Sequence, residues 1–134
     1  MAQHLSAKII VVGRDARQSS PELAKALISG ITDSGADVLD IGLAGTEEMY
    51  WAVTEFKACA GIEVTASHNP INYNGLKFVK SGSQPFHPVQ DFQVIKKIAE
   101  ASNWKFKGSG GGVKEISFLA RGSYVKKVLS FINF

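Results

Sequence analysis

The sequence has a single cysteine, Cys59, among its 134 residues. One cysteine excludes an intramolecular disulfide framework and a cysteine-rich zinc site, and it makes a reducing cytoplasm the simplest compartment. We expect Cys59, which lies between two alanines, to be a small buried apolar residue. No apolar run is long enough to span a membrane, and residues 1–7 lack the basic start and apolar core of a secretory signal. The sequence therefore predicts no membrane partner.

The chain also lacks a strong excess of either charge, since 15 Lys and Arg face 12 Asp and Glu, for a net charge of +3. Apolar residues interrupt the largest basic cluster, whereas nucleic-acid binders usually show a dense basic stripe with stacking aromatics. That cluster consists of Lys96, Lys97, Lys105 and Lys107. We expect it to be a solvated surface, and we expect no nucleic-acid partner. Trp51 and Trp104 are expected to pack inside the fold rather than to stack on sugars.

What remains is an ordinary globular composition, with 45% hydrophobic and 20% charged residues, enough for one domain. Apolar, β-branched runs predict four strands, at residues 8–12, 38–41, 61–65 and 76–79. Helix-start signals and apolar stripes predict helices from Ser19, from Thr46, from Pro88, and from about Arg121 to Ile132. The alternation predicts an α/β fold, a three-layer αβα domain over residues 1–134 with a mostly parallel or mixed four-stranded sheet. Residues 108–112 are predicted to form a flexible Gly-rich loop.

Three polar segments follow the predicted parallel strands, at residues 13–20, 42–48 and 66–75. The carboxyl ends of parallel strands meet at one edge of a sheet, and ligands bind there in open α/β folds. We therefore expect these segments to gather on one rim.

The most distinctive segment is Thr65-Ala66-Ser67-His68-Asn69-Pro70, followed by Asn72-Tyr73-Asn74-Gly75-Leu76-Lys77. Its small residues, amides, proline and glycine predict a tight, ordered loop. The loop presents the hydroxyl of Ser67, the imidazole of His68 and the ammonium of Lys77, while Asn69 and Asn74 can orient their neighbours.

Serine-hydrolase chemistry fits this loop poorly. It needs a base within hydrogen-bond reach of the serine, and that base must be oriented by a carboxylate. Ser67 and His68 are adjacent, so we expect their side chains to diverge, and the chain has no Gly-x-Ser-x-Gly segment.

Phosphoryl chemistry fits the loop better. Nearby cations can hold a phosphate by neutralising its charge, and Arg14 and Arg17 follow the first predicted strand on the same rim. The sequence has no Gly-x-x-x-x-Gly-Lys-Ser/Thr pattern, so a P-loop nucleotide site is excluded.

Residues 65–77 closely resemble the active-site serine loop of the α-D-phosphohexomutases, the phosphomannomutase/phosphoglucomutase superfamily. The segment Gly13-Arg14-Asp15-Ala16-Arg17-Gln18-Ser19-Ser20 resembles the first β–α turn of that family. Residues 38–48 resemble the bacterial phosphomannomutase version of the second turn, and residues 124–133 resemble the helix that leads out of the first domain. The similarity covers roughly residues 7–133.

This resemblance implies a reversible phosphoryl transfer between hexose 1-phosphate and hexose 6-phosphate through a bound bisphosphate, in the cytoplasm. Ser67 matches the serine that the family carries as phosphoserine, and an oxygen of that phosphate is a ligand of the catalytic Mg²⁺. His68 matches a residue beside the reacting phosphate, and Lys77 matches one near the reacting hydroxyl. The resemblance further implies phosphate-binding roles for Arg14, Arg17, Asn69 and Asn74, with Arg17 close enough to hold either the loop or its phosphate. It also implies a mannose or glucose phosphate as substrate and a hexose 1,6-bisphosphate as activator.

The chain departs from the family pattern in its length. Family enzymes have four domains around one cleft, and their Asp-Gly-Asp-x-Asp metal loop, absent here, belongs to the second domain. We therefore expect residues 1–134 to be a first-domain fragment of a longer chain, with the missing domains as partners and no useful mutase activity by itself.

Each candidate residue also has a plain structural explanation. Ser67 and His68 can be ordinary loop residues, Lys77 an exposed strand lysine, and Arg14 and Arg17 partners of Asp15 or Glu22. Residues 46–48 are most simply a helix start. The alternative function is a non-catalytic phosphate-binding or interaction domain.

Overall fold

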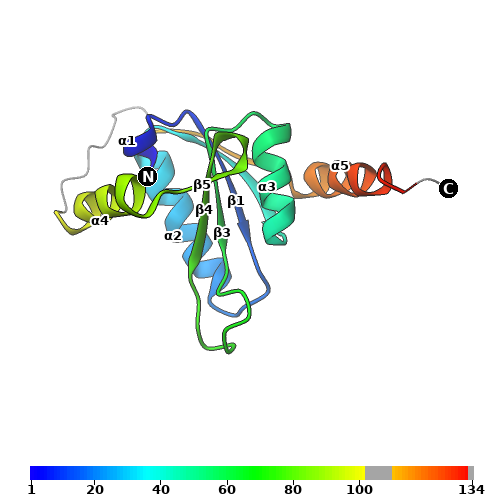
Figure 1. Ribbon diagram of the computed structural model, residues 1–134, viewed down its shortest axis with the longest axis horizontal. Helices are drawn as coiled ribbons and strands as arrows, with labels where there is room; N and C mark the ends of the chain where they lie inside the picture. The colour runs from blue at the N-terminus through cyan, green and yellow to red at the C-terminus, as the bar shows by residue number, and fades with distance from the viewer. Residues whose placement is uncertain (102–109, 133–134) are drawn as a thin grey trace.

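The computed structural model describes residues 1–101 and 110–132, and within them one mixed sheet lies between helices on both faces (Figure 1). The strands are β1 (Ile9–Arg14), β2 (Asp37–Leu43), β3 (Ala60–Val64), β4 (Leu76–Lys80), β5 (Gln84–Pro85) and β6 (Val113–Glu115). The helices are α1 (Ala2–Leu5), α2 (Ser20–Asp33), α3 (Thr46–Glu55), α4 (Gln93–Glu100) and α5 (Ser117–Leu129), with short turns η1 (Ser81–Ser83) and η2 (Pro88–Phe92). This is the α/β class that the sequence predicts.

The sheet has the strand order β5-β4-β3-β1-β2-β6. Strands β6, β2, β1 and β3 are parallel to one another, whereas β4 is antiparallel to β3 and β5 is antiparallel to β4. Ile10, Val11 and Val12 of the central strand β1 are all buried, because helices cover both faces of the sheet. That is why β1 has a continuous apolar sequence instead of an alternating one.

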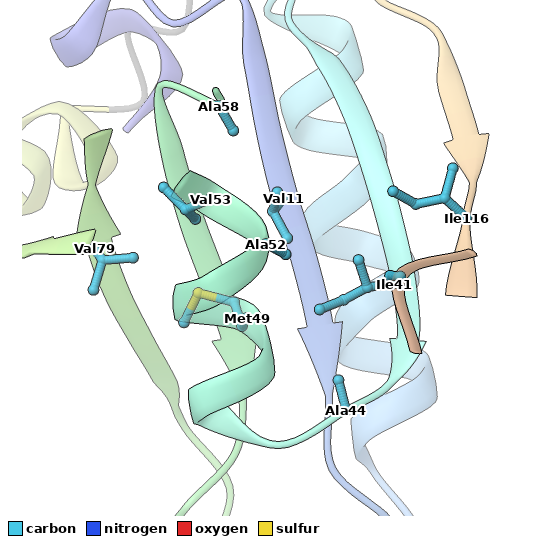
Figure 2. Packing of buried hydrophobic residues seen from close by; sticks show 10 residues of the cluster. Val11, Ile41, Ala44, Met49, Ala52, Val53, Ala58, Val79 and Ile116 are labelled. Atoms are coloured by element: carbon cyan, nitrogen blue, oxygen red, sulfur yellow. The ribbon is translucent and has the colours of Figure 1, made fainter. Parts of the chain in front are cut away.

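Helices α2 and α3 cover opposite faces of the sheet. Ile31 of α2 packs on one face in a cluster with Ile10, Val12, Val38, Ala60 and Ile62. On the other face, Met49, Ala52 and Val53 of α3 point toward side chains of the sheet, among them Val11 and Ile41 (Figure 2). Burying one leucine-sized side chain stabilises a fold by about 1.5–3 kcal/mol. These two clusters therefore stabilise the packing of both helices on the central strands.

The observed sheet has two more strands than the four expected. Both β5 and β6 are short and exposed, so neither has the apolar run by which the other strands are recognised. Gly111 and Gly112 lead into β6, and their N–H groups donate to Thr32 O at 2.8 Å and to Asp37 Oδ1 at 2.7 Å. Of the predicted Gly-rich loop, residues 108 and 109 lie outside the described residues.

Helix α5 begins at Ser117 instead of near Arg121, and it projects away from the sheet (Figure 1). The helix ends at Leu129, before the predicted end at Ile132. Its apolar stripe is largely uncovered, since Val125 and Leu129 are 45% and 49% exposed, and Ile132 beyond its end is 50% exposed. None of the helices in the described part of the chain is long and apolar enough to cross a bilayer.

The expected packing role of Trp51 is confirmed, since its ring lies 5.9 Å from that of Phe56 and 5.5 Å from that of Tyr124. The expectation that Cys59 is a buried apolar residue is wrong: it is only partly buried, since it lies just before β3 at the edge of the core, and its Sγ accepts the Lys8 N–H at 3.4 Å. Trp104, Lys105 and Lys107 lie outside the described residues.

Asp91 in η2 is a buried carboxylate that joins three parts of the chain. It pairs with His4 Nε2 of α1 and with Lys80 Nζ of β4, each at 2.9 Å, and it accepts the His87 N–H at 2.7 Å. The hydrogen bond to His4, then those from Lys80 and His87, hold the pKa of Asp91 well below its usual range. Because folding lowers this pKa, the stabilisation is present above the ordinary value of 3.8 and is lost as the pH falls below it.

We expect Asp91→Asn to lower the urea midpoint of unfolding at pH 7, because the amide cannot pair with Lys80 and His4 as a charge. The difference from the wild type should shrink as the pH falls below 4. Urea unfolding between pH 2 and pH 7 measures both effects, with the exposed Asp33→Asn as the matched control. Equal midpoints for Asp91→Asn and wild type at pH 7 would contradict the stabilising role.

Candidate functional site

The three polar segments expected on one rim do meet there. The Asp15 N–H, just after β1, donates to Val64 O at the end of β3 at 3.0 Å. The Ala44 N–H, just after β2, donates to Arg14 O at 2.9 Å. The turn after β1 and the loop between β3 and β4 consequently lie together at one end of the sheet (Figure 1). This is the edge at which open α/β sheets bind ligands.

Arg17 is buried, and its guanidinium binds the Ser67 loop, the segment Thr65–Gly75. Nη1 donates to the carbonyls of Pro70 and Tyr73 at 2.7 and 3.0 Å. Nη2 donates to the carbonyls of Ser67 and Asn69 at 3.0 and 2.8 Å. The Nε–H donates to Asp15 Oδ2 at 3.0 Å. All five N–H groups are thus engaged, so in this arrangement Arg17 holds the loop and has no donor left for a phosphate.

Asp15 orients Arg17 and also joins the turn to helix α2. Its Oδ1 accepts the backbone N–H of Arg17 at 3.0 Å and the hydroxyl of buried Ser20 at 2.5 Å. Burial raises the pKa of Asp15, but the hydrogen bonds from Ser20 and Arg17 outweigh it and bring the pKa below its ordinary value. Asp15 is therefore ionised at neutral pH and balances the charge of Arg17.

Ser67 is exposed at the tip of this arrangement and has a left-handed backbone, with φ at 55°. Its N–H donates to Thr65 Oγ1 at 3.0 Å, and its Oγ lies 3.2 Å from Nδ1 of His68. The expectation that the two side chains diverge is therefore wrong, because it assumed an extended loop and the left-handed turn brings them together. Within the described part of the chain, no carboxylate contacts the His68 ring.

Asn69 and Asn74 hold the shape of the loop. Asn69 Nδ2 donates to Ala66 O at 2.8 Å. Asn74 Nδ2 lies 2.9 Å from the hydroxyls of both Ser19 and Ser20, and its Oδ1 accepts the Gly75 N–H at 2.8 Å. Both amides are thus used inside the protein, and Asn74 ties the end of the loop to the start of α2.

Arg14 and Lys77 are the rim cations whose charged groups have no hydrogen bond or ion pair within residues 1–101 and 110–132. Arg14 is the last residue of β1, and Lys77 lies in β4 just after the loop. Both are half-buried, so their aliphatic stems pack while the charges remain available at the rim. Of the alternative pairings with Asp15 or Glu22, Arg17 forms the one with Asp15, and Arg14 forms neither.

Two acidic residues near the rim were not anticipated from the sequence. Glu48 of α3 is buried and pairs with Arg121 of α5, whose Nε lies 2.9 Å from Oε1 and whose Nη2 donates to Leu43 O at 2.5 Å. Glu63 of β3 is fully buried. The signal for Glu63 was present, since it is the only charged residue in an otherwise apolar strand.

The described residues do not form a metal site of their own. No group of three or more His, Cys, Asp or Glu in that part of the chain stands close enough together to hold a metal ion. A Mg²⁺ ion bound through a phosphate on Ser67 would need further ligands from elsewhere, so the steps proposed below are those of this chain's own side chains.

Comparison with known proteins agrees with this geometry. Residues 1–105 match the family model of phosphoglucomutase/phosphomannomutase, alpha/beta/alpha domain I. A phosphomannomutase of Salmonella typhimurium is 39% identical over 133 residues, which are 98% of this chain and 29% of the relative. A Xanthomonas campestris protein named for phosphohexose mutases is 47% identical over 133 residues, covering 99% and 29%. A solved phosphoglucomutase/phosphomannomutase family protein from Burkholderia thailandensis superposes with a TM-score of 0.75 at 30% identity, covering 94% of this chain and 28% of that one. This chain therefore spans less than a third of the length of each of these relatives.

Proposed function

Because the chain belongs to the phosphoglucomutase/phosphomannomutase family and matches its first domain, we propose that Ser67 carries the phosphate that a hexose-phosphate mutase transfers. The observation that carries the proposal is the state of Ser67: an exposed hydroxyl beside an imidazole, on a loop held by the four carbonyl contacts of Arg17. Phosphoryl transfer asks a protein mainly for such positioning and for charge neutralisation.

In the proposed step, a hydroxyl of a bound hexose phosphate attacks the phosphorus on Ser67. The new O–P bond forms as the bond from phosphorus to Ser67 Oγ breaks, which yields a hexose bisphosphate. His68 Nδ1 lies 3.2 Å from Oγ, where it can hand a proton to the departing serine oxygen. The attacking hydroxyl gives its proton to solvent, and the free cations of Arg14 and Lys77 balance the charge of the phosphate. The bisphosphate then turns over in the site, and the phosphate at the other position of the sugar is transferred back to Ser67.

The substrate class is proposed from the relatives, which are named as phosphomannomutases or phosphohexose mutases. A mannose or glucose phosphate is the proposed substrate and a hexose 1,6-bisphosphate the activator. An oxygen of the phosphate on Ser67 is the proposed ligand of a Mg²⁺ ion, which would help to neutralise the charge of that phosphate. The other domains of a longer chain are the proposed partners that supply the remaining metal ligands and the contacts to the sugar.

The Ser67 phosphate is the direct test. We expect peptide mass spectrometry of the protein purified from its native cells to find a phosphate on Ser67 in a measurable fraction of molecules. Ser67→Ala should lose that label while keeping the fold, as checked by circular dichroism. Ser81→Ala, which removes another exposed serine hydroxyl, is the matched control and should keep it. Unphosphorylated Ser67 in protein that turns over hexose phosphates would rule out this mechanism.

Residues 1–134 by themselves are expected to show no useful mutase turnover, because the described residues provide no cluster of metal ligands and the chain covers only 29% of a phosphomannomutase relative. An assay coupled to hexose 6-phosphate oxidation measures this with mannose 1-phosphate and catalytic hexose bisphosphate. Robust turnover by this polypeptide alone would contradict the expectation.

A non-catalytic interaction domain is the second candidate, and helix α5 favours it. Phe118, Leu119 and Phe131 on or beside α5 are 93%, 56% and 73% exposed, which is unusual for apolar side chains that have no partner surface. The two candidates differ at Ser67, because only the mutase requires a phosphate there.

A further inference from the structure

Glu63 is a buried acid that the proposed phosphoryl transfer does not use. Its side chain is 0% exposed, and neither carboxylate oxygen has a hydrogen-bond partner within the described residues. Glu48, the other buried glutamate, differs in this respect because Arg121 binds it. A buried ionised carboxylate without partners is strongly disfavoured, so Glu63 is held as the neutral acid.

The space for this carboxyl group comes from β1. Glu63 is paired with Gly13 across the sheet, and a Cβ at position 13 would overlap Glu63 Oε2 and would lie 3.2 Å from Ile41 Cδ1. The carboxyl therefore lies over the β1 backbone, on the face of the sheet that α3 covers. This position is one residue before the end of β3 and just beneath the Ser67 loop.

The charged groups that face Glu63 come from every element around it. They are Asp15 in the turn after β1, Glu47 and Glu48 at the start of α3, and Lys77 in β4. Burial is the largest cause that raises the pKa of Glu63 to about 8, followed by Asp15, Glu48 and Glu47, while Lys77 lowers it. Arg17 binds Asp15, and Arg121 binds Glu48, so among these surrounding groups Lys77 is the cation without an anionic partner.

Lys77 is the direct neighbour of Glu63 on the adjacent strand. The two residues are opposite each other in the antiparallel pair of β3 and β4. Side chains at such positions share one face of the sheet, with their Cβ atoms about 5 Å apart. The pair Gly61 and Val79, two residues along the same strands, lies on the same face as Glu63 and Lys77. This is the face that α3 covers, because a Cβ at Gly61 would meet both Met49 of α3 and Val79. Lys77 nevertheless forms no ion pair with Glu63 in this structure.

We propose that Glu63 is a positioning residue for Lys77. As a neutral acid, Glu63 leaves the Lys77 ammonium free for the phosphate. As a carboxylate, Glu63 draws that ammonium into an internal ion pair. The proton that Glu63 loses goes to solvent, and no other bond changes. This inference rests on the proposed role of Lys77 at the phosphate. It makes the free charge at the rim depend on pH, with phosphate binding weakening once Glu63 ionises.

Carbon-13 NMR of the chain, with labelled glutamate carboxyls and lysine Cε atoms, tests the coupling between pH 5 and pH 10. The Glu63 carboxyl signal is expected to titrate near pH 8, and the Lys77 Cε signal to show an inflection at the same pH. In Glu63→Gln the Lys77 inflection should disappear, while the matched control Glu55→Gln, on the exposed side of α3, should retain it. Glu63→Met, with a similar volume, serves if the glutamine variant does not fold.

A Glu63 signal that titrates in the ordinary acid range, or a Lys77 signal without an inflection near pH 8, would overturn the inference. So would an inflection that persists in Glu63→Gln. The titration needs no phosphate and no substrate, so its result is independent of whether Ser67 is phosphorylated. A failure of the proposed function and a failure of this coupling are therefore distinguishable.

Discussion

Replacing Arg17 with alanine should release the Ser67 loop from the domain and destabilise the protein by roughly 3–5 kcal/mol, the range for removing one partner of a buried ion pair. Five hydrogen bonds are lost together, so four loop carbonyls and Asp15 Oδ2 each lose one donor. Urea unfolding measures the loss of stability. Hydrogen exchange at the amides of residues 67–74 measures the release of the loop.

Two further substitutions separate the geometry of Arg17 from its charge. Arg17→Lys keeps the charge but has at most three donors and cannot form the planar fork, so we expect it to recover only part of the stability and little of the amide protection. Arg14→Ala removes an arginine from the same rim whose charge has no partner among the described residues, and it should change stability by less than about 0.5 kcal/mol. The loop would be ordered without Arg17 if Arg17→Ala had the wild-type urea midpoint of unfolding and its amides at residues 67–74 stayed protected from hydrogen exchange.

The sequence was sufficient to predict the rim and the loop, because both depend on local signals. Polar segments follow β1, β2 and β3 directly, and a parallel sheet brings the ends of such strands together. The sequence left open whether Arg17 holds the loop or its phosphate, because the loop carbonyls that Arg17 binds lie 50 to 56 residues further along the chain. A sequence pattern shows that an arginine is present on the rim, but only the folded backbone decides whether carbonyls or solvent surround it.

The error about Ser67 and His68 has a similar origin. Adjacent side chains diverge in extended backbone, but Ser67 adopts a φ of 55°, and few residues other than glycine do so. A local hydrogen bond from the Ser67 N–H to Thr65 Oγ1 accompanies this conformation, but the bond from Arg17 to Ser67 O spans 50 residues and depends on tertiary structure. The environment of Glu63 was hidden for another reason. Every residue of β3 is buried, so the strand has no polar-apolar alternation to show which face Glu63 occupies.

Raising the pH from 5 to 9 should reduce the stability of the wild-type protein, and Glu63→Gln should remove most of that dependence. The pKa of Glu63 is about 8 in the folded chain and 4.5 when the group is exposed. The folded state therefore holds a proton that the unfolded state releases, so the stabilisation is complete below pH 4.5 and is lost as the pH rises through 8. Each unit of pKa difference corresponds to about 1.4 kcal/mol, which sets an upper limit of about 5 kcal/mol for the full change.

Urea unfolding of the wild type and of Glu63→Gln at pH 5, 7 and 9 measures this effect as a difference between two curves. The buried amide has a cost of its own, roughly 1–3 kcal/mol if its N–H groups find no acceptor, but that cost does not vary with pH. The result to compare is therefore the slope of the free energy of unfolding against pH. It should be steep for the wild type and for the exposed control Glu55→Gln, and nearly flat for Glu63→Gln. Parallel slopes for all three proteins would mean that Glu63 is ionised in the folded state. Its carboxylate would then have to be paired already at pH 5, and Lys77, opposite it on β4, is the cation placed to pair with it.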